Sequence, residues 1–328
     1  MTIDRPPGAL PRRRIGRTAL DVSVMAVGAA PLGGLYRASS QQDALDTLRA
    51  ALAGGINFID VAPLYGEGLA ERRVGKSLAQ LPTGGLVLST KVGRLLEPTE
   101  PQPLASDWAE GLPFAVVYDT SPDAIRRSLR DSIERLGGAR PSILLLHDPD
   151  RSSEPSALPA VIKEAYQTMA ELRAEGAVTA IGLGVNAPGP CRIALELGDW
   201  DCFLLANSYS VLFQGEEGLL DTCRQRGISV FIGGPYMSGA LAGGSQWRQG
   251  PITESVSADI ERLKTVCSRY GLPLQAAALQ FPLRHPAVAS VIVGMRAPAE
   301  VSQNISFLTT SIPDAFWDNL AAAGFIPR

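Results

Sequence analysis

Polar side chains suited to proton transfer stand where short apolar runs of the sequence end. Asp60, Lys91 and His147 close three successive apolar runs. Asn186 follows the next run, and Tyr65 lies in a Pro-containing loop shortly after Asp60. The carboxyl ends of parallel strands meet on one face, where ligands bind, both in barrels and in doubly wound sheets. We therefore expect these five side chains to meet at one site.

These residue types favour a proton shuttle between a carbonyl and an alcohol. A free tyrosine has a pKa of about 10 and is a poor base at neutral pH. An ammonium group at Lys91 would lower the pKa of Tyr65, and a carboxylate at Asp60 would keep that ammonium charged and fixed. With His147 donating to the substrate oxygen, Tyr65 becomes the general acid or base. Such a site has no electron sink, so it needs a hydride carrier such as a nicotinamide cofactor.

Each of these residues could also have an ordinary structural role. Asp60 could cap a helix, Lys91 could be a solvated charge and His147 a satisfied loop residue. Four polar residues that terminate four consecutive apolar strands are much harder to ascribe to coincidence, so we favour a shared site.

Apolar runs alternate along the chain with segments of helical period, as in parallel α/β folds. Predicted strands cover residues 24–28, 56–60, 86–91, 143–147, 178–185, 202–206, 228–232 and 288–293. Predicted helices cover residues 43–53, 71–81, 122–136, 158–174, 189–197, 219–225, 256–270, 274–284, 298–308 and 315–323. Eight strand–helix units predict a single (β/α)8 TIM barrel domain over residues 1–328, with an N-terminal hairpin and extra C-terminal helices. A doubly wound sheet competes, but no G-x-G-x-x-G motif opens the first helix.

Composition excludes several classes of function. The net charge of −3 predicts no electrostatic binding to nucleic acid or to an anionic membrane. The four cysteines form no C-x-x-C pair, and with two histidines and no acidic cluster we expect no metal site. No apolar run approaches the ~18 residues of a membrane span, and the arginines at 12–14 lack the apolar stretch of a signal peptide. We expect a cytoplasmic protein, as a monomer or a small homo-oligomer, acting on a small molecule.

Over nearly its whole length the sequence resembles an aldo-keto reductase. The matching segments are residues 57–66, 71–75, 89–91, 145–147 and 181–186. The resemblance implies a barrel fold, a nicotinamide cofactor at the mouth, and a catalytic tetrad of Asp60, Tyr65, Lys91 and His147. His147 would also contact the substrate.

Within this family the sequence is more similar to the bacterial L-fucose, D-arabinose and D-threo-aldose dehydrogenases, through residues 64–73 and Tyr118-Asp119. The resemblance implies oxidation of a cyclic sugar at its anomeric carbon to a lactone. Pyridoxal dehydrogenase is similar in the same segments, so pyridoxal 4-dehydrogenase is an alternative, as is a general aldehyde or ketone reductase. The long irregular stretch from Val92 to Thr120 predicts a lid over the substrate. Trp108 and Phe114 in this lid are candidate stacking surfaces for a sugar ring.

The resemblance also implies a set of cofactor-binding residues. Asn186 matches a residue that holds the nicotinamide carboxamide, and Tyr209 matches a tyrosine that stacks on the nicotinamide ring. Val185 and Ala206 depart from the serine and glutamine of many members. The loop expected to cover the pyrophosphate comprises Gly233, Gly234, Met237, Ser238, Gly239 and Leu241.

The choice between NAD and NADP depends on residues after the last predicted strand. Gly294 and Glu300 stand where NADP-using members often have a lysine and an arginine. A carboxylate repels a phosphate and accepts hydrogen bonds from ribose hydroxyls, which favours NAD. Arg296 suits a phosphate and keeps NADP as the alternative. Gln303 and Asn304 match positions that contact the adenine.

Two other classes of protein remain open. The first is a non-catalytic nicotinamide-binding subunit on the same fold. The second is a barrel aldolase or hydrolase that uses Lys91 as a Schiff-base amine. The fold alone does not choose between these, because barrels host many chemistries.

Overall fold

The computed structural model describes residues 10–100, 107–151, 153–248 and 250–327. Eight parallel strands close into one barrel, which confirms the predicted fold. In chain order the strands are β3 (Met25–Gly28), β4 (Phe58–Asp60), β5 (Val87–Val92), β8 (Ile143–His147), β9 (Ala180–Val185), β10 (Cys202–Ala206), β11 (Ser229–Gly233) and β14 (Val288–Gly294). The last strand, β14, pairs with the first, β3, with Val291 opposite Met25, and this pairing closes the sheet.

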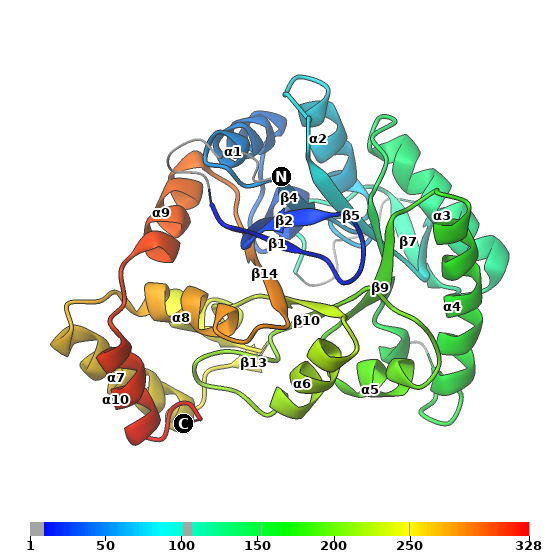
Figure 1. Ribbon diagram of the computed structural model, residues 1–328. Coiled ribbons are helices and arrows are strands. Elements are labelled where there is room, and N and C mark those ends of the chain that lie inside the picture. The colour runs from blue at the N-terminus through cyan, green and yellow to red at the C-terminus, as the bar shows by residue number, and fades with distance from the viewer. Residues whose placement is uncertain (1–9, 101–106, 152, 249, 328) are drawn as a thin grey trace.

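Helices surround the barrel (Figure 1). They are α1 (Gln41–Ala53), α2 (Leu69–Leu78), α3 (Pro122–Arg135), α4 (Leu158–Ala174), α5 (Gly189–Leu195), α6 (Glu217–Gln225), α7 (Glu254–Arg269), α8 (Leu274–Leu283), α9 (Pro298–Thr309) and α10 (Asp314–Ala322). Short 3-10 helices are η1 (Ala30–Gly33), η2 (Pro149–Arg151) and η3 (Ala240–Ala242). Ser121 accepts a hydrogen bond from the backbone N–H of Ala124 and is the N-cap of α3.

An N-terminal hairpin closes the amino end of the barrel. Its strands are β1 (Arg12–Arg14) and β2 (Asp21–Ser23), which pair antiparallel as the sequence predicted. The hydroxyl of Ser229, at the start of β11, donates to the carbonyl of Arg14, and Ile15 at the turn is fully buried. The opposite, carboxyl end of the barrel lies away from this hairpin.

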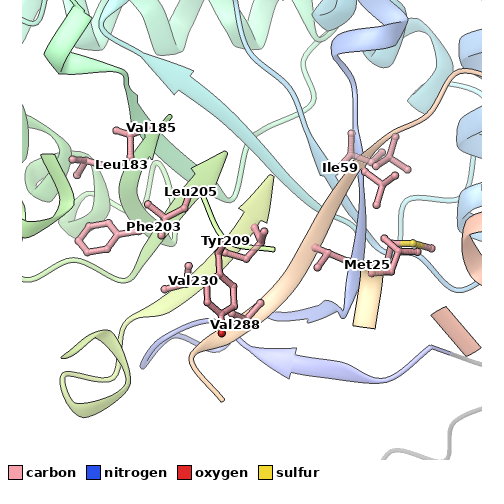
Figure 2. Close-up of a cluster of buried hydrophobic side chains, with 14 of the residues drawn as sticks. Met25, Ile59, Leu183, Val185, Phe203, Leu205, Tyr209, Val230 and Val288 are labelled. Carbon is pink, nitrogen blue, oxygen red and sulfur yellow. The ribbon is translucent and has the colours of Figure 1, made fainter. Parts of the chain in front are cut away.

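Side chains alternate between the inside of the barrel and the layer beneath the helices, as the pleat of a strand requires. Phe58 and Phe231 belong to strands that are not neighbours, yet their ring centroids lie 5.0 Å apart across the interior. The residue beside Phe58, Ile59, belongs instead to the outer cluster, with Leu183 and Val230 (Figure 2). Because Asp60 lies two positions after Phe58, it shares the inward face and ends the strand there.

The stretch between Val92 and Thr120 contains regular structure, contrary to the prediction of an irregular lid. Strands β6 (Arg94–Pro98) and β7 (Phe114–Tyr118) form an antiparallel hairpin beside the barrel. The Phe-Ala-Val-Val-Tyr sequence of β7 is rich in strand-forming residues, a signal that the Pro- and Gly-rich surroundings concealed. A second small sheet, of β12 (Gln246–Trp247) and β13 (Gly250–Pro251), lies in the loop that follows β11.

The cysteines are all buried, and none of the four forms a disulfide. Burial raises the pKa of each thiol above its ordinary value. Among the described residues, no helix has the length and apolar character needed to cross a membrane.

Candidate active site

A cavity of about 630 Å³ opens at the carboxyl end of the barrel. It touches the end of every barrel strand, through Gly28, Asp60, Lys91, His147, Gly184, Leu204, Gly233 and Ile292. Such a position is where barrels bind their ligands, and the volume lies within the usual range for a small-molecule site.

Lys91 is the centre of the polar group at the floor of this cavity. Its Nζ lies 2.8 Å from Oδ2 of Asp60, 3.0 Å from the carbonyl oxygen of Val61 and 3.0 Å from the hydroxyl of Tyr65. The other carboxylate oxygen of Asp60 accepts a hydrogen bond of 2.7 Å from Ser89. The Lys91 and Asp60 side chains are 2% and 3% exposed, so both charges are stabilised by these hydrogen bonds and not by water.

The loop that carries Tyr65 is packed tightly against η1. Gly66 has a φ of +61°, and a Cβ atom there would lie 2.2 Å from the carbonyl oxygen of Gly33. A larger residue at this position would push the two loops apart. Farther along, Arg73 in α2 donates to the carbonyl of Leu32 in η1, at 2.8 Å. The position of the phenol is therefore set by backbone packing as well as by Lys91.

The balance of charges at Tyr65 differs from the sequence-based expectation. Burial raises the pKa of Tyr65 above its ordinary value, and the ammonium of Lys91 offsets only part of that rise. Burial also opposes the charge on Lys91, but Asp60 and Tyr65 outweigh it and raise the pKa of Lys91. The predicted lowering of the tyrosine pKa is therefore wrong in direction for the site without ligand, because desolvation of the phenolate is the larger effect. At neutral pH Tyr65 is a phenol and Lys91 an ammonium.

His147 faces Tyr65 as a neutral imidazole. The two rings are perpendicular, with centroids 6.4 Å apart. Burial, followed by the positive charges of Arg94, Lys91 and Arg151, holds the pKa of His147 well below its ordinary value. Its Nδ1 is buried, and no described part of the chain supplies it with a hydrogen-bond partner. A neutral histidine has one N–H to donate, so it can bind a substrate oxygen without supplying a competing acidic proton.

The structure adds a buried ion pair, between Arg94 and Asp148, that the sequence analysis missed. Both residues line the cavity, and their side chains are 5% and 4% exposed. Asp148 also accepts a hydrogen bond from the side-chain amide of Asn186, at 3.1 Å, and lies 3.7 Å from Nε2 of His147. The signal was available in the sequence, since Asp148 follows His147 directly and Arg94 stands three residues after Lys91.

The glycine-rich loop after β11 turns its backbone toward the cavity. Gly234, Ser238 and Gly239 line the cavity with φ values of 61°, 58° and 97°. Oδ1 of Asn207 accepts a hydrogen bond of 3.0 Å from the N–H of Ser238, which fixes the turn. Small residues and left-handed backbone of this kind let N–H groups approach phosphate oxygens. These residues, together with Asn186, fit a dinucleotide cofactor.

Arg296 lies across one edge of the cavity. Its guanidinium donates to the main-chain carbonyls of Leu35 and Arg37, each at 3.2 Å, which ties the loop after β14 to the loop after β3. The carboxylate of Glu300 accepts a hydrogen bond of 2.7 Å from the backbone N–H of Arg296. Gly294 also lines the cavity, next to Pro31.

Trp108 lines the cavity beside Tyr65, with ring centroids 6.0 Å apart, so its contact with the substrate stays a prediction. Backbone pairing with Leu35 holds this part of the chain against η1. Phe114, the other aromatic residue proposed for the substrate, does not line the cavity. It lies in β7, where it pairs with Pro98 at the far end of the hairpin from Arg94.

Several residues proposed to bind the cofactor lie outside the cavity wall. Tyr209 is the clearest case, since its ring packs at 5.3 Å from that of Phe281 and belongs to the buried cluster of Figure 2. The left-handed backbone of Asn207, with a φ of 51°, turns the chain there before Tyr209. The others are Met237, Leu241, Glu300, Gln303 and Asn304. Met237 and Leu241 are fully buried, so they support the glycine-rich loop from below.

No cluster of three or more histidine, cysteine, aspartate or glutamate side chains suited to a metal occurs within the described ranges.

Comparison with known proteins places this geometry in a family. The model of the "Aldo/keto reductase family" matches residues 24–324. A pyridoxal 4-dehydrogenase of Microbacterium luteolum is 40% identical, over 96% of this chain and 98% of that protein. A D-threo-aldose 1-dehydrogenase of a Pseudomonas species is 34% identical, over 94% and 96% of the two chains. The structure of an aldo-keto reductase from Bacillus halodurans superposes with a TM-score of 0.74 at 24% identity, over 95% and 96% of the chains.

The Lys91–Asp60 pair yields a prediction for stability. Replacing Lys91 by Met leaves a buried carboxylate without its cation and should lower the free energy of unfolding by about 3–5 kcal/mol. The double variant Asp60→Asn/Lys91→Met removes both charges and should recover at least half of that loss. Urea unfolding measures both values.

The matched control is Lys264→Met, which breaks an exposed pair with Glu261 and should have little effect. If the double variant were as unstable as Lys91→Met, the pair would not be the source of the loss.

Proposed function

Because the chain belongs to the aldo/keto reductase family, we propose that it oxidises a cyclic hemiacetal to a lactone with a nicotinamide cofactor. The first candidate substrate is an aldose of the L-fucose or D-threo type, oxidised at C1. The second is pyridoxal, whose aldehyde also closes into a cyclic hemiacetal, and the 40% identity to a pyridoxal 4-dehydrogenase favours it. The observation that carries the proposal is the contact of the Tyr65 hydroxyl with the Lys91 ammonium, at 3.0 Å, beside the neutral His147.

In this proposal Tyr65 moves the proton. Its phenolate accepts the proton of the hemiacetal hydroxyl, and the Lys91 ammonium stabilises the phenolate while the proton is absent. His147 donates its N–H to the same substrate oxygen and fixes its position. A bound nicotinamide cofactor supplies the hydride acceptor. Asp60 keeps Lys91 charged through the cycle, because a buried ammonium without a carboxylate would lose its proton.

We propose that the cofactor lies with its carboxamide at Asn186 and its pyrophosphate along Gly233, Gly234, Ser238 and Gly239. NAD is the preferred form in this proposal. The guanidinium of Arg296 already donates to two main-chain carbonyls, and Glu300, which accepts from the backbone N–H of Arg296, would repel a 2′-phosphate. Arg296 could bind such a phosphate only by leaving those carbonyls.

A substrate and cofactor screen tests the proposed function directly. Initial rates should be measured with NAD and with NADP on L-fucose, D-arabinose, L-galactose, D-xylose and pyridoxal. We expect turnover of at least one hemiacetal and a kcat/KM at least about tenfold higher with NAD, a difference of ~1.4 kcal/mol. Absence of turnover across the panel, with NAD bound, would favour a non-catalytic subunit. A preference for NADP would contradict the cofactor assignment.

Replacing Tyr65 by Phe should remove the proton acceptor and leave the cavity nearly unchanged. We expect kcat to fall at least about 100-fold, because general acid–base catalysis contributes on that scale. The affinity for NADH, followed by its fluorescence, should stay within about twofold of wild type. If Tyr65→Phe retained most of the wild-type rate, another residue would be the base.

The raised pKa of Tyr65 predicts how the rate depends on pH. Oxidation requires the phenolate, which is the minor form at neutral pH, so kcat/KM for oxidation should rise up to about tenfold per pH unit. Reduction uses the phenol, which predominates, so its rate should be nearly constant from about pH 6 to about pH 8. Rate profiles in both directions measure this. A flat profile for oxidation would contradict the assignment of a raised pKa to the base.

A further inference from the structure

We propose that Arg94 determines specificity by binding a hydroxyl or phenolate oxygen that lies one or two carbons from the reacting carbon of the substrate. This inference rests on the proposed function and narrows its substrate class. Aldoses carry a hydroxyl at C2, next to the reacting C1, and pyridoxal carries a phenolic oxygen on the ring carbon beside the one that bears its aldehyde. Simple aldehydes carry neither.

The first observation is the position of Arg94 at the cavity. It begins β6 two residues after the end of β5, and its side chain lines the cavity although it is only 5% exposed. Its Nη2 and the Nε2 of His147 both lie within 4 Å of the same oxygen, Oδ2 of Asp148. Arg94 therefore lies beside His147, which in the proposed function binds the reacting oxygen of the substrate. The neighbouring hydroxyl or phenolic oxygen of the substrate would lie near Arg94.

The second observation is an incomplete set of partners. A guanidinium has five N–H donors. Within the described chain, the hydrogen bond that Arg94 makes runs from Nη2 to Asp148. Its Nε is buried and has no hydrogen-bond partner among the described residues. Buried polar groups usually have partners, and an unsatisfied donor on a charged group is costly. A substrate oxygen in the cavity that Arg94 lines would give this guanidinium a further hydrogen-bond partner.

The third observation is that Arg94 is held rigidly for such a task. The ring of Tyr118, the residue opposite Arg94 in the hairpin, lies 5.1 Å from its guanidinium carbon. Asp148, which fixes the other side, has a φ of 41° and is itself bound by the backbone N–H of Asn186, at 3.2 Å.

A purely structural or purely electrostatic role for Arg94 would have different consequences. If Arg94 only attached the β6–β7 hairpin to the barrel, its loss would reduce turnover of every substrate alike. If it only kept His147 neutral, its loss would change the pH profile for every substrate alike. A residue that binds a particular oxygen changes the ratio between two substrates that differ in that oxygen alone.

The experiment therefore uses matched pairs of substrates. D-arabinose and 2-deoxy-D-ribose differ in the 2-hydroxyl, and salicylaldehyde and benzaldehyde, used for reduction with NADH, differ in the ortho hydroxyl. The wild type should favour the hydroxylated member by at least about 100-fold in kcat/KM, because a site built to bind a hydroxyl rejects the analogue that lacks it. In Arg94→Met this ratio should fall below about 5, mainly through loss on the hydroxylated member.

Two further variants keep the result interpretable. Arg94→Lys retains a cation beside Asp148 and should fold, but it cannot reproduce the fork of a guanidinium, so its ratio should be intermediate. Arg127→Met is the matched control, because Arg127 binds Glu97 of the same hairpin on an exposed face, at 2.6 Å. Its ratio should equal that of the wild type.

The outcomes separate this inference from the proposed function. A ratio that collapses in Arg94→Met and is intermediate in Arg94→Lys supports it. An active wild type whose ratio is unchanged in both Arg94 variants would overturn the inference and leave the function standing. The same holds if the variants weaken NADH binding without changing the ratio. A wild type that turns over no member of either pair would overturn both.

Discussion

One buried ion pair, between Lys91 and Asp60, determines how the rest of the site is arranged. Neither side chain is more than 3% exposed, so the ammonium must obtain from the protein what water would otherwise supply. It does so from a carboxylate, a main-chain carbonyl and a phenol. The first two hold the charge in place, and the third is the group on which the charge acts. The proposed chemistry and the stability of the site therefore depend on the same contacts.

The register of the barrel brings the functional residues to this pair in regular steps. Asp60 is paired with Ser89, two residues before Lys91. Lys91 is paired with Leu145, two residues before His147, and His147 with Gly184, two residues before Asn186. A step of two residues keeps a side chain on the same face of a strand. The side chains of these residues therefore all lie on the inward face of the barrel or continue from it. A Cβ at Gly184 would lie 3.4 Å from Cε of Lys91, at ordinary van der Waals contact, so the lysine side chain packs directly over this strand.

This periodicity explains what could be predicted from the sequence. Strand ends are marked by a change from apolar to polar residues, and the direction of an inward side chain follows from alternation, so the barrel and the group around Lys91 were predictable. The orientation of loop residues was not, because it depends on backbone angles such as the left-handed φ of Asn207, beyond which Tyr209 enters the core. Arg94 was missed for a related reason. Val92 is paired with Leu146, so two further residues on each chain lead to Arg94 and Asp148, but the predicted strand ended at Lys91 and the register was not continued to this pair.

In the function that we propose, the closed sheet carries the proton-transfer residues and the hairpin carries the residue that selects the substrate. Asp60, Lys91 and His147 belong to barrel strands, whereas Arg94 and Tyr118 belong to an excursion that pairs with itself. An exchange of the excursion would leave the hydrogen bonds between barrel strands untouched. In evolution, replacement of the β6–β7 hairpin could thus change the substrate of such a protein while the residues proposed for proton transfer stay the same. Protein engineering could follow the same route.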